Sequence, residues 1–153
     1  VCYGYRVPLL SVSTLQLLCV PVLLRYDDLP EDALLVPMID ARRMEVYAGV
    51  YNRALREIRE VGADVVDADT YKAYLDEHPV YFFGDGSTKC EAVIQHPNAH
   101  FIPGILPLAK NMYPLAERML MRGEVKDVAY FEPFYLKEFV ATKSRNLLES
   151  VSR

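Results

Sequence analysis

Two apolar runs separated by a short polar break stand out in the first half of the chain. The run 33–39 is almost continuously apolar, whereas the run 45–51 carries an apolar residue at every second position. Both patterns are typical of β-strands. Because the break at 40–43 is so short, the two runs predict an antiparallel hairpin.

Shorter apolar segments predict further strands. A third antiparallel strand is expected after a turn at Asn52-Arg53, and an acidic loop is expected over 26–32. The additional strands and extended segments predicted in this way are 7–12, 54–58, 64–66, 80–83, 99–102 and 128–131.

Helical signals alternate with these strands. Ser13 and Gln16 have the spacing of a capping box, so a helix is expected to begin there, and Pro21 limits how far it runs without a kink. Pro114 interrupts the last helical pattern and predicts a kink or a restart. Later helices are predicted over 71–77 with a cap at Asp69 or Thr70, over 87–94, and over 107–122. This order predicts an α/β fold, with a mixed sheet that helices cover on its faces.

Composition narrows the class of protein. The chain has 153 residues, of which 52% are hydrophobic and 25% charged, and this suits one compact domain. Its net charge of −4 argues against a large surface for binding phosphates, although a local basic patch or binding through a more basic partner stays open.

The apolar segment 7–24 is interrupted by Pro8 and Pro21, so it does not predict a membrane span or a signal peptide. The three cysteines form no Cys-x-x-Cys or Cys/His cluster. They therefore indicate reduced thiols in a cytoplasmic protein rather than a zinc site.

Two loops are candidates for binding an anion. In the first, Asp40 follows a strand and stands beside Arg42 and Arg43, whose guanidinium groups suit phosphate. An ordinary hairpin turn with solvent-facing arginines is the alternative. In the second, Gly84-Asp85-Gly86 follows one strand and precedes a helix, where backbone N–H groups favour anions. An ordinary capped β–α turn is the alternative there.

Other chemical groups give no coherent site. His78, His96 and His100 lack a third ligand at a suitable spacing, so no metal site is predicted. No nucleophile motif is present, and no catalytic residue is predicted. The aromatic segment 130–137 carries few basic residues, which favours core packing or a partner surface over stacking on nucleic-acid bases.

Three stretches resemble the TsaB (YeaZ-type) family. Val-Pro-Leu-Leu-Ser-Val-Ser-Thr-Leu at 7–15 resembles the segment that closes the N-terminal half of these proteins. The stretch 37–47 is similar to their Asp-Ala-Arg-x-x-Glu-Val-Tyr hairpin, and 127–136 resembles their Pro-x-Tyr-Leu ending.

The resemblance implies an actin-like ATPase (ASKHA) architecture built from two ribonuclease-H-like halves. The chain is then a single C-terminal ribonuclease-H-like domain, 1–153, with 1–24 as the joining segment. Its opening lacks a Met and is typical of the end of a helix closed by Gly4, which predicts that the N-terminal half is missing.

In this architecture the hairpin at Asp40 stands where ATPases place a phosphate loop, and Gly84-Asp85-Gly86 resembles the loop on the adenosine side. Arg42 and Arg43 stand where close approach to phosphate needs glycines. The expected loop is therefore vestigial, and no cofactor is expected.

The resemblance also implies a role. It predicts a non-catalytic subunit that supports TsaD, together with TsaE, in threonylcarbamoyl transfer to adenosine 37 of tRNA (t6A biosynthesis). TsaD is expected to be contacted mainly through the missing half, and tRNA indirectly through the complex; self-association of the chain stays open. The alternatives are a nucleotide-hydrolysing or glycoprotease-like enzyme of the same fold, and a module that binds tRNA directly.

Overall fold

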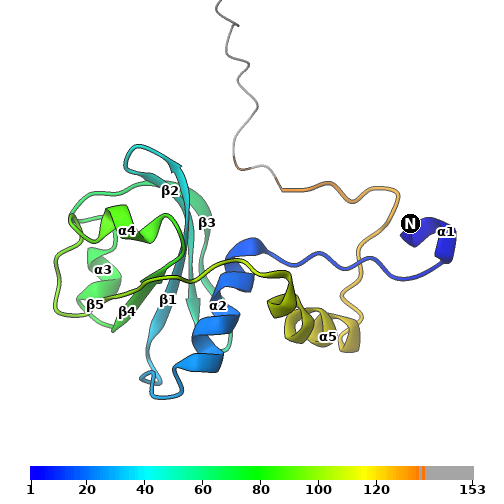
Figure 1. Ribbon diagram of the computed structural model, residues 1–153, viewed down its shortest axis with the longest axis horizontal. Helices are drawn as coiled ribbons and strands as arrows, with labels where there is room; N and C mark the ends of the chain where they lie inside the picture. The colour runs from blue at the N-terminus through cyan, green and yellow to red at the C-terminus, as the bar shows by residue number, and fades with distance from the viewer. Residues whose placement is uncertain (135, 137–153) are drawn as a thin grey trace, which may run out of the picture.

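A five-stranded mixed sheet forms the centre of the protein in a computed structural model, which describes residues 1–134 and 136 (Figure 1). The strands are β1 Leu34–Arg42, β2 Glu45–Asn52, β3 Glu57–Val65, β4 Val80–Phe83 and β5 Ala99–Ile102. Their order across the sheet is β3-β2-β1-β4-β5. β1, β2 and β3 are antiparallel neighbours, whereas β4 and β5 run parallel to β1. The predicted α/β class with an antiparallel hairpin region is confirmed.

Helices cover both faces of this sheet. The described helices are α1 Cys2–Tyr5, α2 Thr14–Arg25, α3 Lys72–Leu75, α4 Ser87–Cys90, the 3-10 helix η1 Ala109–Met112, and α5 Tyr113–Met121. α2 lies on one face, and α3 and α4 lie on the other (Figure 1). The helix predicted at Ser13 is confirmed, although the Ser13 side chain makes no capping hydrogen bond. α3 and α4 are shorter than predicted, with four residues each.

Two hydrophobic cores result, one on each face. The core under α3 and α4 contains Met38, Val46 and Phe82, whereas the core under α2 contains Leu35 and Phe83. Neighbouring residues of one strand therefore belong to opposite cores, as the alternation of side chains along a strand requires. A strand buried on both faces is apolar at nearly every position, which explains the continuous run at the start of β1.

The third strand differs from its prediction. The segments 54–58 and 64–66 were expected as separate strands, but the structure has a single strand, β3. Asn52 explains where β3 begins, because its Oδ1 accepts the backbone N–H groups of Ala54 and Arg56 at 3.0 and 2.9 Å. An Asn side chain that binds the backbone in this way stabilises a turn, so the next strand begins only after the turn ends.

The N-terminal segment also differs from its prediction. α1 ends at Tyr5 and is capped by Arg6, which has a positive φ of 52°, so the helix is not closed by Gly4. The segment 7–12 is not a buried strand, since only Leu9 forms an isolated bridge, with Lys126.

The C-terminal part gives one confirmation and one correction. The predicted restart near Pro114 is confirmed, because η1 gives way to α5 at Tyr113. The segment 128–131 is a turn rather than an extended segment, and the Phe131 N–H donates to the Asp127 carbonyl at 2.9 Å.

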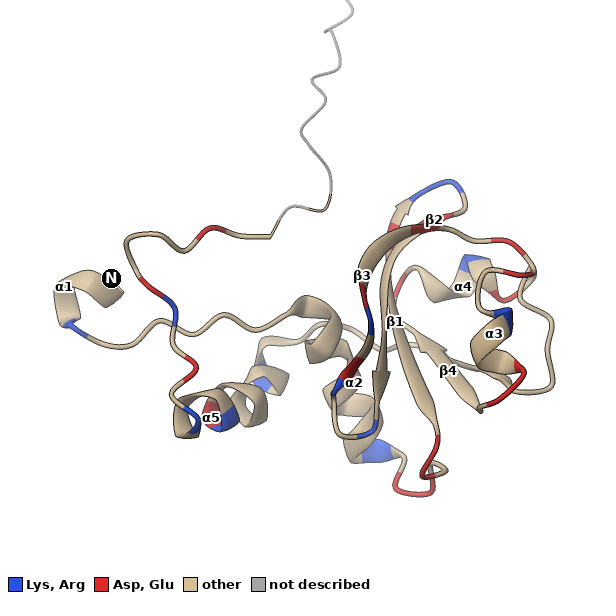
Figure 2. Ribbon diagram, turned by 180° about the vertical axis from the view of Figure 1, so that it is seen from behind, with Lys and Arg blue, Asp and Glu red and all other residues tan. Residues whose placement is uncertain are grey.

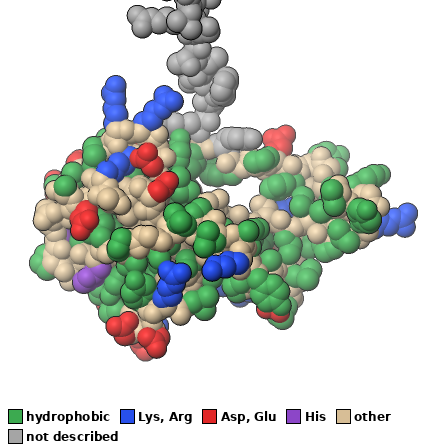
Figure 3. Space-filling view, in the orientation of Figure 1, with side chains coloured by type: hydrophobic (Ala, Val, Ile, Leu, Met, Phe, Trp, Pro, Cys, Tyr) green, Lys and Arg blue, Asp and Glu red, His purple; other side chains and the backbone are tan. Residues whose placement is uncertain are grey.

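Residues 1–12 and 106–134, here called the arm, lie to one side of the sheet (Figure 1). Most of the exposed large apolar side chains of the described residues belong to the arm, among them Tyr3, Tyr5, Tyr113, Met121, Tyr130 and Phe134. Figure 3 shows apolar side chains spread over this part of the surface. Within the described residues, no helix combines the length and apolarity needed to cross a bilayer.

Candidate functional site

The two loops singled out in the sequence meet at one edge of the sheet. β1 and β4 are parallel neighbours, so their carboxyl ends lie side by side. The Asp40 N–H donates to Asp85 Oδ1 at 3.1 Å, and the Gly86 N–H donates to the Met38 carbonyl at 3.2 Å. The structure therefore brings Asp40 together with the whole Gly84-Asp85-Gly86 loop.

The two glycines of this loop make room for β1. Gly84 has a φ of +99°, and a Cβ placed on it would lie 2.2 Å from the Met38 carbonyl oxygen. A Cβ on Gly86 would lie 2.9 Å from the carbonyl carbon of Ile39. Because the space beside both glycines is already filled by the chain's own backbone, their role here is close packing of strand against loop.

Lys89 completes this junction and was not predicted. From α4 it forms an ion pair with Asp40, and its Nζ donates to the Glu45 carbonyl at 2.7 Å. We call Asp40, Asp85 and Lys89 the Asp40 cluster. Its partner Asp40 lies 49 positions earlier, so the ion pair leaves no local pattern in the sequence. The only hint is that Lys89 is the one charged residue of α4.

Arg42 and Arg43 are separate from this cluster. β1 continues past Asp40 through an irregularity in its pairing with β2, so the predicted turn over 40–43 is wrong in its bounds and the turn lies at Arg43-Met44. Both arginines are exposed at the hairpin tip, where Arg42 is paired with Glu45 in the strand ladder. Within the described residues, neither arginine side chain makes a hydrogen bond or an ion pair. The arginines and the Gly84 loop therefore do not form one anion site in this structure.

The chemistry available to the Asp40 cluster is limited by its internal bonds. Ser87 Oγ donates to the Gly84 carbonyl at 2.8 Å, which closes the loop further. Burial raises the pKa of the nearby Cys90 thiol, with a smaller opposite effect from Lys89, so the thiol is held in its protonated, unreactive form. The arrangement is that of a closed strand–loop–helix junction.

The histidines lie apart from one another. His78 lies 3.7 Å from Asp32, His96 lies 3.6 Å from Asp76, and the His100 ring stacks on Tyr81. Throughout 1–134 and at 136, no three His, Cys, Asp or Glu side chains are grouped so that they could hold a metal ion. The three cysteines are free.

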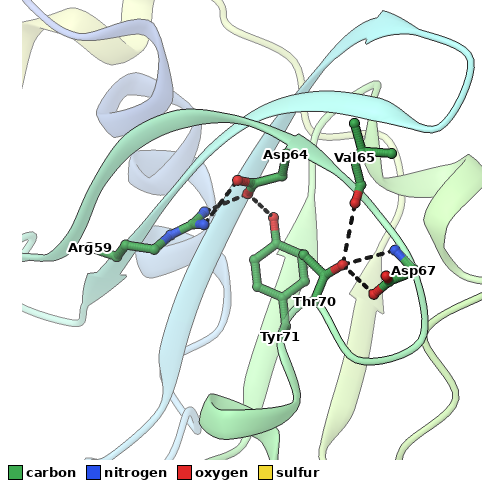
Figure 4. A network of polar contacts seen from close by, with 6 residues as sticks. All are labelled: Arg59, Asp64, Val65, Asp67, Thr70 and Tyr71. Carbon is green, nitrogen blue, oxygen red and sulfur yellow. Dashed lines mark hydrogen bonds and ion pairs between the residues drawn. The ribbon is translucent and has the colours of Figure 1, made fainter.

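A polar network that the sequence did not reveal fastens β3 to α3 (Figure 4). Arg59 donates to both oxygens of Asp64 at 3.0 and 2.6 Å, and the Tyr71 hydroxyl donates to Asp64 Oδ2 at 2.6 Å. Burial, with help from the bond to Asp64, raises the pKa of Tyr71 well above its usual value. An irregularity in the β2–β3 register brings Arg59 and Asp64 to the same side of the strand. The network serves the fold, because the Asp64 carboxylate is bound by both Arg59 and Tyr71.

An open groove of about 820 Å³ lies between the sheet and the arm. Ile39, Tyr47 and Val61 form its floor on the sheet. The first turn of α2, Met119 and the stretch 131–134 line its sides. Lys126 and Glu132 are its charged residues, and Ser11, Ser13, Thr14 and Gln16 are its uncharged polar ones. The other lining residues are apolar or aromatic.

No family model and no curated protein sequence matches the chain. Two solved structures from Pseudomonas aeruginosa are similar to the chain. An uncharacterized protein with similarity to peptidase YeaZ has a TM-score of 0.70 and 24% identity, over 89% of this chain and 62% of its own. YeaZ itself has a TM-score of 0.63 and 25% identity, over 88% of this chain and 62% of its own.

These structures confirm the resemblance to YeaZ-type (TsaB) proteins and the ribonuclease-H-like, ASKHA-type fold class. The antiparallel β1–β3 and the parallel β4 and β5 are the part of that fold described above. The chain spans 62% of the length of each of the two structures.

Proposed function

We propose that this YeaZ-type chain belongs to a non-catalytic subunit that supports a TsaD protein in threonylcarbamoyl transfer to adenosine 37 of tRNA. The observation that carries the proposal is the closed Asp40 cluster. The Asp85 carboxylate binds the Asp40 N–H, Lys89 neutralises Asp40, and the two glycines on either side of Asp85 are packed against β1. A loop closed in this way leaves little room for a phosphate group to approach its backbone.

The arm supports a role as a subunit. Tyr3, Tyr113 and Tyr130 are 85%, 70% and 84% exposed, and other large apolar side chains surround them. Extended apolar surfaces of this kind mark contacts with other proteins. In the proposed complex, the nucleotide and metal chemistry belongs to TsaD and TsaE, tRNA is held by the assembly, and the work takes place in the cytoplasm.

The other candidate is an enzyme that hydrolyses nucleotides or peptides. One of the similar structures is of a protein with similarity to peptidase YeaZ, which favours testing this directly. The two candidates differ in what the Asp40 cluster does. In an enzyme, Asp40 or Asp85 must engage a substrate, whereas in a supporting subunit both serve only the packing of the loop.

The decisive experiment is a reconstituted tRNA modification reaction with TsaD, TsaE and the threonylcarbamoyl donor. The reaction is run with and without the complete protein that the gene of this chain encodes. We expect modification to depend on this protein and TsaD to co-purify with it. Asp40→Ala and Asp85→Ala variants that remain folded are expected to support normal modification, and their loss of activity would favour the enzyme.

Nucleotide binding is tested separately by thermal unfolding with millimolar ATP and Mg²⁺. A ligand at about 100 times its Kd stabilises a protein by about 2.7 kcal/mol. We expect no such stabilisation here, with TsaE as the positive control. A clear rise in Tm that disappears in Asp40→Ala would contradict the proposal.

A further inference from the structure

The tip of the β1–β2 hairpin departs from the usual chemistry of tight turns. Two-residue turns favour Gly, Asn or Asp where φ is positive, yet Arg43 occupies this position with a φ of 51°. A side chain with a Cβ is disfavoured in this conformation. The sequence therefore has an arginine at a position where a glycine would relieve the backbone strain.

The surroundings hold this turn in place. The Val66 N–H donates to the Met44 carbonyl at 2.8 Å, and the Met44 side chain packs against the core under α3 and α4. On the following residue, the Glu45 carbonyl accepts Lys89 Nζ at 2.7 Å. Strained residues that are fixed from several sides occur preferentially at functional positions.

The charges around the tip leave the arginines available. Asp40, on the same strand, is paired with Lys89 instead. The side chains of Arg42 and Arg43 are exposed, and they make no ion pair or hydrogen bond with any part of the chain that the structure describes. Figure 2 shows this basic tip at the end of the hairpin, beyond the body of the sheet.

We propose that Arg42 and Arg43 form a preorganised docking point for a carboxylate-rich protein surface. This rests on the proposed function only in taking the partner to be a protein. The turn fixes the backbone of both arginines, and each guanidinium group can bind a carboxylate through two hydrogen bonds. RNA fits less well, because its affinity grows with the number of neutralised phosphates.

The first test is an NMR titration of the chain with a peptide of alternating Glu and Asp. The Nε–Hε signals of Arg42 and Arg43 are compared with those of Arg53 and Arg56, at the opposite turn of β2. We expect the tip signals to move first and a Gln/Asn peptide to have no effect. Equal shifts at both turns, or shifts only with a single-stranded RNA oligonucleotide, would overturn the proposal.

Charge-reversed variants carry the test into the complex. Arg42→Glu/Arg43→Glu is expected to weaken binding of the complete protein to TsaD by at least about ten-fold. The matched control Arg53→Glu/Arg56→Glu, with the same change in charge, is expected to stay within about two-fold. If wild type binds TsaD and both variants bind equally well, the docking point is wrong while the subunit role stands. If the acidic peptide binds at the tip and TsaD does not bind at all, the subunit role fails while the docking point stands.

Arg43→Gly separates strain from charge. It is expected to raise the Tm by about 2 °C, because the left-handed conformation becomes unstrained. It is also expected to weaken binding of the acidic peptide. A variant that gains stability and binds the peptide unchanged would show that Arg43 takes no part in docking.

Discussion

The sheet and the arm contain the same kinds of large side chain and differ in where those side chains lie. Phe82 and Phe83, on β4, are completely buried between helices and neighbouring strands. Phe134 and Tyr130, in the arm, are 78% and 84% exposed. A side chain stabilises a fold by the apolar area that it removes from water. The buried side chains of the sheet therefore contribute more to the stability of the chain than the exposed side chains of the arm do.

The largest expected effect breaks the sheet directly. Phe82 contacts the rings of Tyr71 and Phe101 at centroid distances of 5.3 and 5.0 Å. Phe82→Ala is expected to cost about 3–5 kcal/mol of unfolding free energy, measured by urea denaturation. Phe134→Ala in the arm is expected to change it by less than about 0.5 kcal/mol. Similar losses for the two variants would mean that the arm is part of the folded core.

Two glycines with positive φ extend the comparison to the backbone. Gly84 adjoins the sheet, and a Cβ there would collide with Met38, whereas Gly123 in the arm has a φ of +67° and open space around it. Gly84→Ala is expected to cost at least about 2 kcal/mol, since the collision adds to the strain of the left-handed conformation. Gly123→Ala introduces only the strain of the left-handed conformation, which is expected to lower the free energy of unfolding by about 1 kcal/mol. Thermal and urea unfolding of both variants measures the difference, and equal costs would contradict the packing of Gly84 on β1.

The central strands were predictable because their buried positions are occupied by apolar residues, which stand out in the sequence. The segments 80–83 and 99–102 were predicted with the bounds that β4 and β5 have, and 80–83 is a compact apolar run that a turn follows. β3 was divided wrongly because it lies at the sheet edge. Much of its surface is exposed, and its register irregularity interrupts the alternation on which strand prediction depends.

The candidate site was only half predictable. Asp40 and the Gly84 loop were each identified, but that they touch depends on the parallel pairing of β1 with β4, which brings together residues 45 positions apart. Lys89 was missed because an ion pair across such a distance leaves no local pattern. Arg59, Asp64 and Tyr71 were missed for a similar reason, since a bulge places the first two on one side of β3.

Tyrosine ionisation gives a smaller difference between the sheet and the arm, in how stability depends on pH. Tyr71 and Tyr51 are buried, and burial raises the pKa of both far above the unfolded value near 10. The folded state therefore keeps protons that the unfolded state releases, so stability is full below about pH 10 and falls as the pH rises further.

Tyr71→Phe is expected to cost about 1–2 kcal/mol at neutral pH, because Asp64 loses one of its donors. It is also expected to make the alkaline loss of stability less steep by about one proton. Tyr130→Phe in the arm is expected to leave the stability at neutral pH unchanged, because this side chain is exposed. Urea denaturation between neutral and alkaline pH measures both, and an unchanged slope in Tyr71→Phe would show that Tyr71 ionises freely in the folded protein.

The smallest expected effect concerns one ion pair from each region. Lys89 pairs with Asp40 beside the sheet and also binds the Glu45 carbonyl, whereas Arg122 and Glu124 in the arm lie 3.8 Å apart in solvent. An exposed pair contributes little, so Arg122→Met is expected to leave stability unchanged within about 0.3 kcal/mol. Lys89→Met is expected to cost about 1 kcal/mol, since a backbone carbonyl loses its donor as well. Thermal unfolding at low and high salt distinguishes the two contributions. The part due to Asp40 is screened by salt, but the hydrogen bond to the strand is not, so a loss that persists at high salt identifies Lys89 as a structural link between α4 and the hairpin.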